Sequence, residues 1–193
     1  MKLTDAIKEK GTPYWIPDCS RDELPEFFKE LGFKVGVEIG VLVGKFTEKF
    51  CLAGLKMYGI DPWVSFSGQG RGQQLQTQEN YNYSLAKKRL SPYKDCTLIK
   101  KASMEALVDF DPESLDFVYI DGDHRFRYIA EDIYEWYWKV KHGGIVAGDD
   151  YYLTQPRANN LICQVSPVVD AFVKTYGIEN FYIFDGNWMF FKP

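Results

Sequence analysis

Apolar runs of strand length alternate with amphipathic stretches along most of this chain. The strand-like runs lie at residues 34–40, 56–61, 97–100, 115–121 and 143–149. Apolar residues recur at helical spacing within residues 21–32, 44–54, 126–140 and 166–177. Near the C-terminus, two further strand-like runs flank Asp185-Gly186 in the stretch FYIFDGNWMFFKP, an arrangement typical of a β-hairpin.

This alternation predicts an α/β fold with a doubly wound, mainly parallel sheet. The five runs and the C-terminal antiparallel hairpin together predict a seven-stranded sheet. The length of 193 residues suits a single domain over residues 1–193, in which residues 1–32 are predicted to form an N-terminal helical segment. Residues 64–80 are rich in Gly, Gln and Ser and predict a loop, either a lid or substrate-recognition loop or an idle surface insertion.

Small and polar residues gather where the predicted strands end. They are Gly40, Asp61, Ser103, the segment Asp121-Gly122-Asp123-His124 and the pair Asp149-Asp150. The carboxyl ends of parallel strands share one edge of a sheet, and doubly wound folds bind their ligands there. We therefore expect the two acidic clusters to face a single crevice.

Composition narrows the classes of ligand and location. The net charge is −4 and the basic residues are scattered, which disfavours a nucleic-acid substrate. Aromatic residues make up 17% of the chain, and Tyr and Trp can line a pocket for a small molecule. Four cysteines without CxxC spacing, no signal peptide and no membrane-length apolar run predict free thiols in a cytoplasmic protein without a membrane partner. The sequence leaves homo-oligomerisation open.

The turn after the first strand, VEIGVLVGKFT, indicates the charge of a cofactor. Gly40 allows a tight turn, and Gly44 leaves room for a ligand at the start of the next helix. A dinucleotide-binding fingerprint reads G-x-G-x-x-G, whereas this turn reads Glu38-x-Gly40-x-x-x-Gly44. Glu38 would repel a pyrophosphate and attract a cationic cofactor, so the turn favours the latter.

With this turn, residues 33–193 resemble the S-adenosylmethionine-dependent methyltransferases of the Rossmann-like class. The acid-x-Gly-x-x-x-Gly turn is the first motif of that class, and the terminal hairpin is another of its marks. The resemblance implies S-adenosylmethionine as the cofactor, with Glu38 near its methionine end and both glycines leaving room for it. It also implies that Asp61 contacts the ribose hydroxyls and that Ser103 of KASME contacts the adenine. Asp121 is implied to be a further cofactor-binding residue.

A narrower resemblance comes from YIDGDH, followed by a helix and then GGIVAGDDY. These segments resemble metal-dependent sugar O-methyltransferases of the macrocin and mycinamicin type and, more distantly, catechol O-methyltransferase. The resemblance implies a divalent metal, foremost magnesium, held by Asp121, Asp149 and Asp150, with Asp121 and His124 as catalytic residues and His124 as the base. Carboxylates on one edge repel one another unless a cation lies between them, and oxygen ligands suit Mg²⁺.

The same resemblance implies a small-molecule acceptor with a sugar or vicinal-diol group, because two hydroxyls could displace waters from such a metal. Contacts to the acceptor are expected from residues 64–80 and from the N-terminal stretch YWIPDCS. The main functional prediction is therefore an O-methyltransferase. A metal-independent N-methyltransferase and a cofactor-binding protein without catalysis stay open, whereas Glu38 and the missing fingerprint disfavour an NAD-dependent oxidoreductase.

Simpler structural roles compete at several of these positions. Asp123 is predicted to cap the helix that starts near His124 rather than to bind a metal. Asp150 suits a cap or a solvent-facing turn, and Asp149 could orient a substrate without any metal. His124 could be a packed strand-end residue, and His142 is expected at the C-terminus of a helix, where it favours the dipole.

Overall fold

The computed structural model describes residues 2–9, 11–65, 76–151 and 163–193. The helices of these ranges are α1 (Leu3–Ala6), α2 (Leu24–Glu30), α3 (Lys45–Leu52), α4 (Gln76–Leu90), α5 (Ser103–Ala106), α6 (Phe126–Tyr137) and α7 (Val165–Thr175), with 3-10 turns η1 (Arg21–Glu23) and η2 (Leu107–Asp109). The strands are β1 (Gly11–Trp15), β2 (Val35–Ile39), β3 (Lys56–Ile60), β4 (Cys96–Ile99), β5 (Leu115–Ile120), β6 (Val140–Gly148), β7 (Asn180–Phe184) and β8 (Asn187–Phe191).

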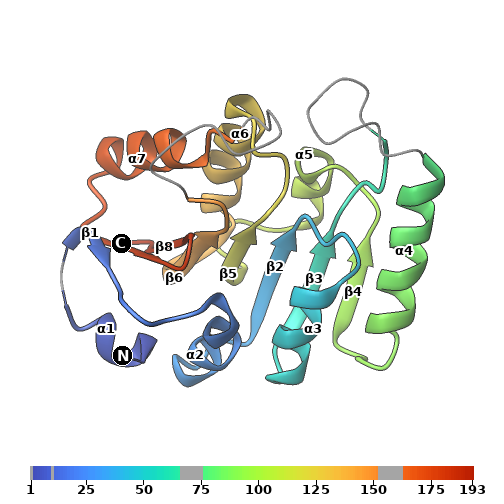
Figure 1. Cartoon of the computed structure of the whole chain (residues 1–193), viewed down its shortest axis with the longest axis horizontal. Coiled ribbons are helices and arrows are strands. Elements are labelled where there is room, and N and C mark those ends of the chain that lie inside the picture. Colours follow the sequence, from blue (N-terminus) through green and yellow to red (C-terminus); the bar gives the residue numbers. More distant parts are fainter. Residues whose placement is uncertain (1, 10, 66–75, 152–162) are drawn as a thin grey trace.

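The eight strands found in the described ranges form one sheet in the order β1-β7-β8-β6-β5-β2-β3-β4 (Figure 1). Neighbouring strands pair in parallel, except that β8 is antiparallel to both β6 and β7. The predicted doubly wound, mainly parallel sheet with its C-terminal hairpin is confirmed. The chain winds outward from β2 to β4 and then returns to β5 beside β2. The carboxyl ends of β2 and β5 therefore form the switch point at which such sheets bind ligands.

The predicted number of strands was one too few, because the N-terminal segment 1–32 contains β1 as well as helices. β1 pairs in parallel with β7 at the edge of the sheet. Its sequence GTPYW contains Pro13, which cannot donate a ladder hydrogen bond and is tolerated on an edge strand. Its side chains also show no buried alternation, so no core-facing pattern marked this strand in the sequence. The helical prediction holds for η1 and α2 within residues 21–32.

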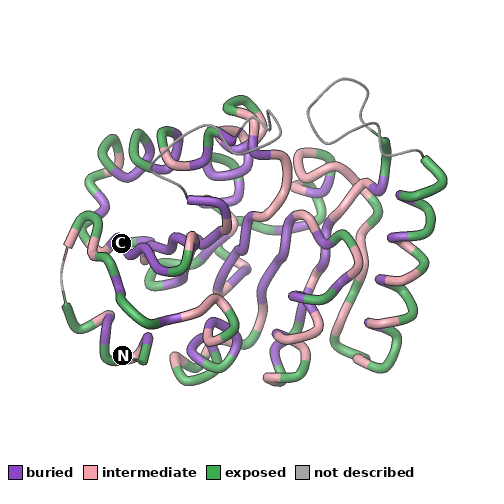
Figure 2. The backbone as a smooth tube through the Cα atoms, in the orientation of Figure 1, coloured by how far each residue is buried: buried purple, intermediate pink, exposed green. Residues whose placement is uncertain are grey.

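Helices cover both faces of the sheet, as Figure 1 shows. Along β5, Val118 and Ile120 point to the core that contains α6 and α7, while Phe117 and Tyr119 point to the core that contains α2 and α3. Figure 2 shows that the central strands are mostly buried and that the helices expose their outer sides. Burial on both faces explains why these strands read as continuous apolar runs.

The predicted loop 64–80 is shorter than expected, because Gln76 already begins α4. The buried positions Glu79, Asn82, Ala86 and Leu90 follow helical spacing, but two of them are polar. Because two of these buried positions are polar, apolar periodicity did not predict this helix. Residues 66–75 lie outside the described residues, so the proposed lid stays a prediction. Among the helices described, none is long and apolar enough to cross a membrane.

Candidate active site

Gly40 brings the turn after β2 against the end of β5. Its φ is +89°, and a Cβ at this position would lie 2.0 Å from the carbonyl oxygen of Asp121. The backbone N–H of Gly40 donates to Ile60 (2.9 Å), and that of Asp121 donates to Ile39 (2.8 Å). This position requires glycine, because a side chain would push the ends of β2 and β5 apart. The predicted tight turn is confirmed, and it places Asp121 beside the turn.

Gly44 packs against α4. It is the N-cap of α3 with φ 76°, and a Cβ there would lie 2.9 Å from Leu90 of α4. The missing side chain therefore lets α4 approach the start of α3. The predicted role of Gly44 in leaving room for a ligand stays a prediction.

Glu38 of β2 is enclosed in the protein. The residue is 2% exposed, and the hydroxyl of Thr47 in α3 donates a hydrogen bond to its carboxylate. Burial, partly offset by the bond from Thr47, raises the pKa of Glu38 to about 8. The carboxyl is then mostly protonated near neutral pH. Glu38 can attract a cationic cofactor, as predicted, only if the positive charge of that cofactor lowers the pKa of the carboxyl and so favours its ionised form.

Asp61, directly after β3, ties two backbone segments together. Its Oδ2 accepts from the N–H of Leu42 (2.9 Å) and its Oδ1 from the N–H of Trp63 (2.8 Å). The indole N–H of Trp63 in turn donates to the carbonyl of Leu42 (2.7 Å). The N–H of Val41 also donates to this carboxylate, which has about four acceptor sites and can therefore still accept a ribose hydroxyl. Asp61 thus shapes the Gly-rich turn in addition to its predicted binding role.

Ser103 begins α5 and hydrogen-bonds to Asp132 of α6, a residue that sequence reasoning missed. Asp132 is 3% exposed, and its Oδ1 has no hydrogen-bond partner among the described residues. Burial raises the pKa of Asp132 to about 7, although the bond with Ser103 lowers it. A signal existed, because Asp132 lies between Ile129 and Trp136 on the apolar stripe of its helix. The adenine contact of Ser103 stays a prediction.

Asp121 and Asp149 face the same cation, the guanidinium of Arg21. The Nη1 atom of Arg21 lies 2.5 Å from Asp149 Oδ2 and 3.6 Å from Asp121 Oδ2. Burial and the nearby charge of Asp121 raise the pKa of Asp149 to about 6. The guanidinium also lies over the ring of Phe46, 4.9 Å from its centroid. The two acidic clusters therefore meet at one edge of the sheet, and Arg21 is the residue that joins them.

His124 pairs with the third aspartate. Its Nδ1 lies 2.7 Å from Asp150 Oδ2, while its Nε2 lies 3.5 Å from Asp121 Oδ1, too far for a strong hydrogen bond. Burial alone would lower the pKa of His124, but the two carboxylates outweigh it and raise that pKa to about 9. The ring is thus an imidazolium near neutral pH. It can accept a proton only after it has lost one.

Asp150 is turned inward, with φ 62° and 6% exposure, so the alternative of a solvent-facing Asp150 is wrong. In the part of the chain that the structure describes, the side chains whose ligand atoms lie within 4.8 Å of one another are His124, Asp150 and Cys163. The three predicted carboxylate ligands are therefore divided. Asp121 and Asp149 face Arg21, whereas Asp150 faces His124.

Two simpler roles predicted from the sequence are wrong. Asp123 is not the N-cap of α6, which is Arg125: the backbone N–H of Phe126 donates to the side chain of Gln164 (2.9 Å), while Asp123 accepts from the backbone N–H of Arg125 (3.1 Å) and pairs with its guanidinium. His142 does not end a helix, since α6 stops at Tyr137 and His142 lies exposed in β6, 3.0 Å from Glu113. α6 begins only at Phe126, later than predicted, whereas β6 already begins at Val140, before the predicted strand at 143–149.

Arg21 was missed because its role depends on distant parts of the chain. The segment before α2 shows a capping box, in which Ser20 accepts from Asp22 N and the Glu23 side chain accepts from Ser20 N. That signal marks a helix start and says nothing about where the intervening arginine points. Arg21 meets Asp149 across 128 positions of sequence, and no local pattern records such a contact.

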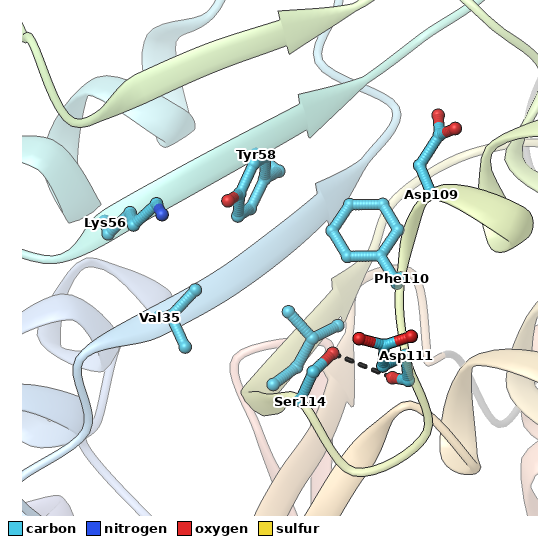
Figure 3. A pocket seen from close by; sticks show the side chains of 8 residues that line it. Val35, Lys56, Tyr58, Asp109, Phe110, Asp111 and Ser114 are labelled. Atoms are coloured by element: carbon cyan, nitrogen blue, oxygen red, sulfur yellow. Dashed lines mark hydrogen bonds between the residues drawn. The ribbon is translucent and has the colours of Figure 1, made fainter.

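A separate cavity opens at the opposite edge of the sheet, where β2, β3 and β5 begin. It has a volume of about 360 Å³, and Figure 3 shows Val35, Lys56, Tyr58 and Phe110 around it. Its lining contains none of the residues predicted for the site. The carboxyl ends of the strands, rather than this cavity, therefore form the candidate active site.

The buried acids predict how stability changes with pH. A carboxyl whose pKa is raised by folding binds its proton more tightly in the folded state, so its contribution is present at low pH and is lost as pH rises through the folded pKa. Glu38 and Asp132 have pKa values raised to about 8 and about 7. We expect the free energy of unfolding to fall between about pH 5 and about pH 9, by up to roughly 4 kcal/mol per group.

Urea unfolding across this pH range measures the effect. Asp132→Asn removes one titrating group and should flatten the dependence, so that the variant loses less stability than the wild type as pH rises. Equal slopes for the two proteins would show that Asp132 titrates alike in the folded and unfolded chains.

Known proteins with this fold include several methyltransferases. Residues 37–151, more than half of the chain, match a family described as a methyltransferase domain. A putative caffeoyl-CoA O-methyltransferase from Staphylococcus aureus is 18% identical, with a TM-score of 0.66 over 92% of this chain and 86% of that chain. An O-methyltransferase from Bacillus cereus, solved with S-adenosylhomocysteine, is 14% identical, with a TM-score of 0.61 over 91% and 83% of the two chains.

An rRNA methylase from Streptococcus thermophilus is also similar, with 14% identity and a TM-score of 0.60 over 92% of this chain and 99% of that chain. At these identities the likeness shows the fold alone, and the fold does not select the acceptor. No curated protein is significantly similar in sequence to this chain.

Proposed function

The chain belongs to this methyltransferase family, and on that premise we propose that it transfers a methyl group from S-adenosylmethionine to an oxygen of a small molecule. One observation carries the proposal. The Gly40 turn touches Asp121 at the switch point of the sheet, so the predicted cofactor turn and the acidic cluster share one edge. A methyl donor and a group that handles the acceptor proton would then lie side by side.

Methyl transfer to an alcohol requires position and a deprotonated oxygen. The leaving thioether needs no acid, but an alcohol does not ionise unaided near neutral pH. His124 would accept the proton in its neutral form, and Asp150 would hold the ring through the 2.7 Å contact at Nδ1. That contact leaves Nε2 on the side of Asp121, where it is enclosed and has no hydrogen-bond partner among the described residues. Asp121 and Asp150 supply negative charge that favours an imidazolium once the proton has moved.

We further propose that a divalent metal, foremost Mg²⁺, assists. The donor chemistry fits, because Asp121 and Asp149 already offer one oxygen each to a single cationic atom of Arg21. These two would hold the metal, with Asp150 as the third predicted ligand if it left His124. When bound, such an ion stabilises an acceptor alkoxide.

The acceptor is proposed to carry a sugar or vicinal-diol group. The N-terminal stretch lies close to the acidic pair, as the contacts of Arg21 show, and Trp15 is 49% exposed with its ring 6.1 Å from that of Tyr151. Apolar rings beside carboxylates suit a ligand with both apolar faces and hydroxyls. The net charge of −4 argues against a nucleic-acid partner. An N-methyltransferase stays the alternative and would act without metal.

Binding of S-adenosylhomocysteine by calorimetry tests the cofactor. Asp61→Ala should weaken that binding by about 1.5–3 kcal/mol, the range for hydrogen bonds to a charged group. Because Asp61 also holds Leu42 and Trp63, a thermal melt must show that the variant is folded at the temperature used. Unchanged affinity in a folded variant would remove Asp61 from the cofactor site, and a wild type that binds no S-adenosylhomocysteine would contradict the proposed function.

A further inference from the structure

Arg21 contacts one carboxylate oxygen of Asp121 and one of Asp149. Its Nη1 faces Oδ2 of both Asp149 and Asp121, at 2.5 and 3.6 Å. The second oxygen of Asp149 is engaged elsewhere, whereas that of Asp121 has, among the described residues, only a distant histidine beside it. Oδ1 of Asp149 accepts from the N–H of Asp150 (2.8 Å), and Oδ1 of Asp121 lies 3.5 Å from His124 Nε2. A cation that bridged the two aspartates through these facing oxygens would need the pair that Arg21 contacts.

The base of Arg21 is fixed, whereas its tip has room to move. The capping box of Ser20 and Glu23 holds the backbone of η1. The guanidinium rests over Phe46, and the side chain is 35% exposed. A long arginine side chain can therefore leave the carboxylates by rotation about its own bonds, and η1 need not unfold.

We propose that Arg21 and a divalent cation compete for Asp121 and Asp149, so that Arg21 sets how tightly this protein binds the metal. Two positive groups cannot both contact the same two oxygens, because their mutual repulsion at such distances outweighs what the second one gains. Arg21 holds the carboxylates together until the ion arrives, and metal binding includes the loss of its two ion pairs. The inference rests on the metal site of the proposed function and adds that Arg21 governs the affinity of that site for the metal.

Titration of the full-length, EDTA-treated protein with Mn²⁺ tests the competition by calorimetry, without cofactor or acceptor. Arg21→Met removes the charge and keeps a flexible apolar chain over Phe46. We expect this variant to bind Mn²⁺ about tenfold or more tightly than the wild type, since the competing ion pairs are gone. Arg21→Lys keeps a positive charge and should bind Mn²⁺ less tightly than Arg21→Met. Arg21→Gln serves as the neutral variant if the methionine variant does not fold.

Arg125→Met is the matched control. Arg125 lies on the same edge and pairs with Asp123, so its loss removes an equal formal charge without touching Asp121 or Asp149. Mn²⁺ affinity in this variant should stay close to that of the wild type. An equal gain in Mn²⁺ affinity in Arg125→Met would show that the net charge of the protein, and not competition for the carboxylates, governs that affinity. This result would overturn the inference.

The outcomes separate the inference from the proposed function. Equal or weaker Mn²⁺ binding by Arg21→Met overturns the competition and leaves the metal site standing. No Mn²⁺ binding by wild type and variant alike overturns both the competition and the metal. Binding of S-adenosylhomocysteine by the same samples tests methyl transfer independently of either result.

Discussion

Replacing His124 by Asn is expected to lower the rate of methyl transfer roughly 10²–10⁴-fold, the usual contribution of a general base. The acceptor oxygen must lose its proton, and among the described residues at this edge of the sheet His124 is the imidazole that lies beside Asp121. Affinity for S-adenosylhomocysteine should stay unchanged, because the residues predicted to hold the cofactor are not altered. Single-turnover rates and calorimetry on the same preparation measure both quantities.

The second histidine of the chain supplies a matched control. His142 is exposed in β6 and lies 3.0 Å from Glu113, so His142→Asn should leave the rate unchanged. Because carboxylates raise the pKa of His124 to about 9, the wild-type rate should rise with pH toward that value, as the ring loses its proton. The idea fails if His124→Asn keeps both the full rate and the same pH profile.

Gly40→Ala is expected to cost more than about 3 kcal/mol of the free energy of unfolding and to abolish cofactor binding. The positive φ of +89° accounts for part of this cost. The larger part comes from the Cβ, which would lie 2.0 Å from the carbonyl oxygen of Asp121, a backbone atom that cannot turn aside. Relief would require β2 and β5 to separate at their carboxyl ends. Urea unfolding and titration with S-adenosylhomocysteine measure the two effects.

Gly54→Ala separates the backbone strain from the clash. Gly54 has φ +87°, but a Cβ there meets nothing within 4 Å. Its replacement should cost about 1–2 kcal/mol, the penalty of the left-handed conformation alone, and should spare cofactor binding. If the two variants lost equal stability, the close approach of Gly40 to Asp121 would not be a constraint on this fold.

Local patterns were sufficient for most of the architecture. The strands from β2 to β8 follow apolar runs, because strands buried on both faces have no polar positions to interrupt them. The Asp-Gly turn marked the C-terminal hairpin for the same kind of local reason, since its backbone conformation restricts which residues fit. β1 and α4 were not predicted, because an edge strand with a proline and a helix with a polar buried stripe show little apolar periodicity.

The position of the candidate site was predictable from the sequence, whereas the contacts between its residues were less so. Parallel strands end at one edge, so the placement of Asp61, Asp121 and Asp149 follows from where the apolar runs stop. The burial of Glu38 behind Thr47 was not predictable, because it depends on how α3 packs on the sheet.

The sequence by itself determined the fold class, the edge that carries the chemistry and the residue types gathered there, because strand and turn patterns are local. The tertiary structure alone decided how the charges pair. It set Arg21 between Asp121 and Asp149, turned Asp150 toward His124 and buried Asp132 beside Ser103. Charge pairing depends on distances between residues that are far apart in the chain, and those distances exist only once the sheet and its helices have packed.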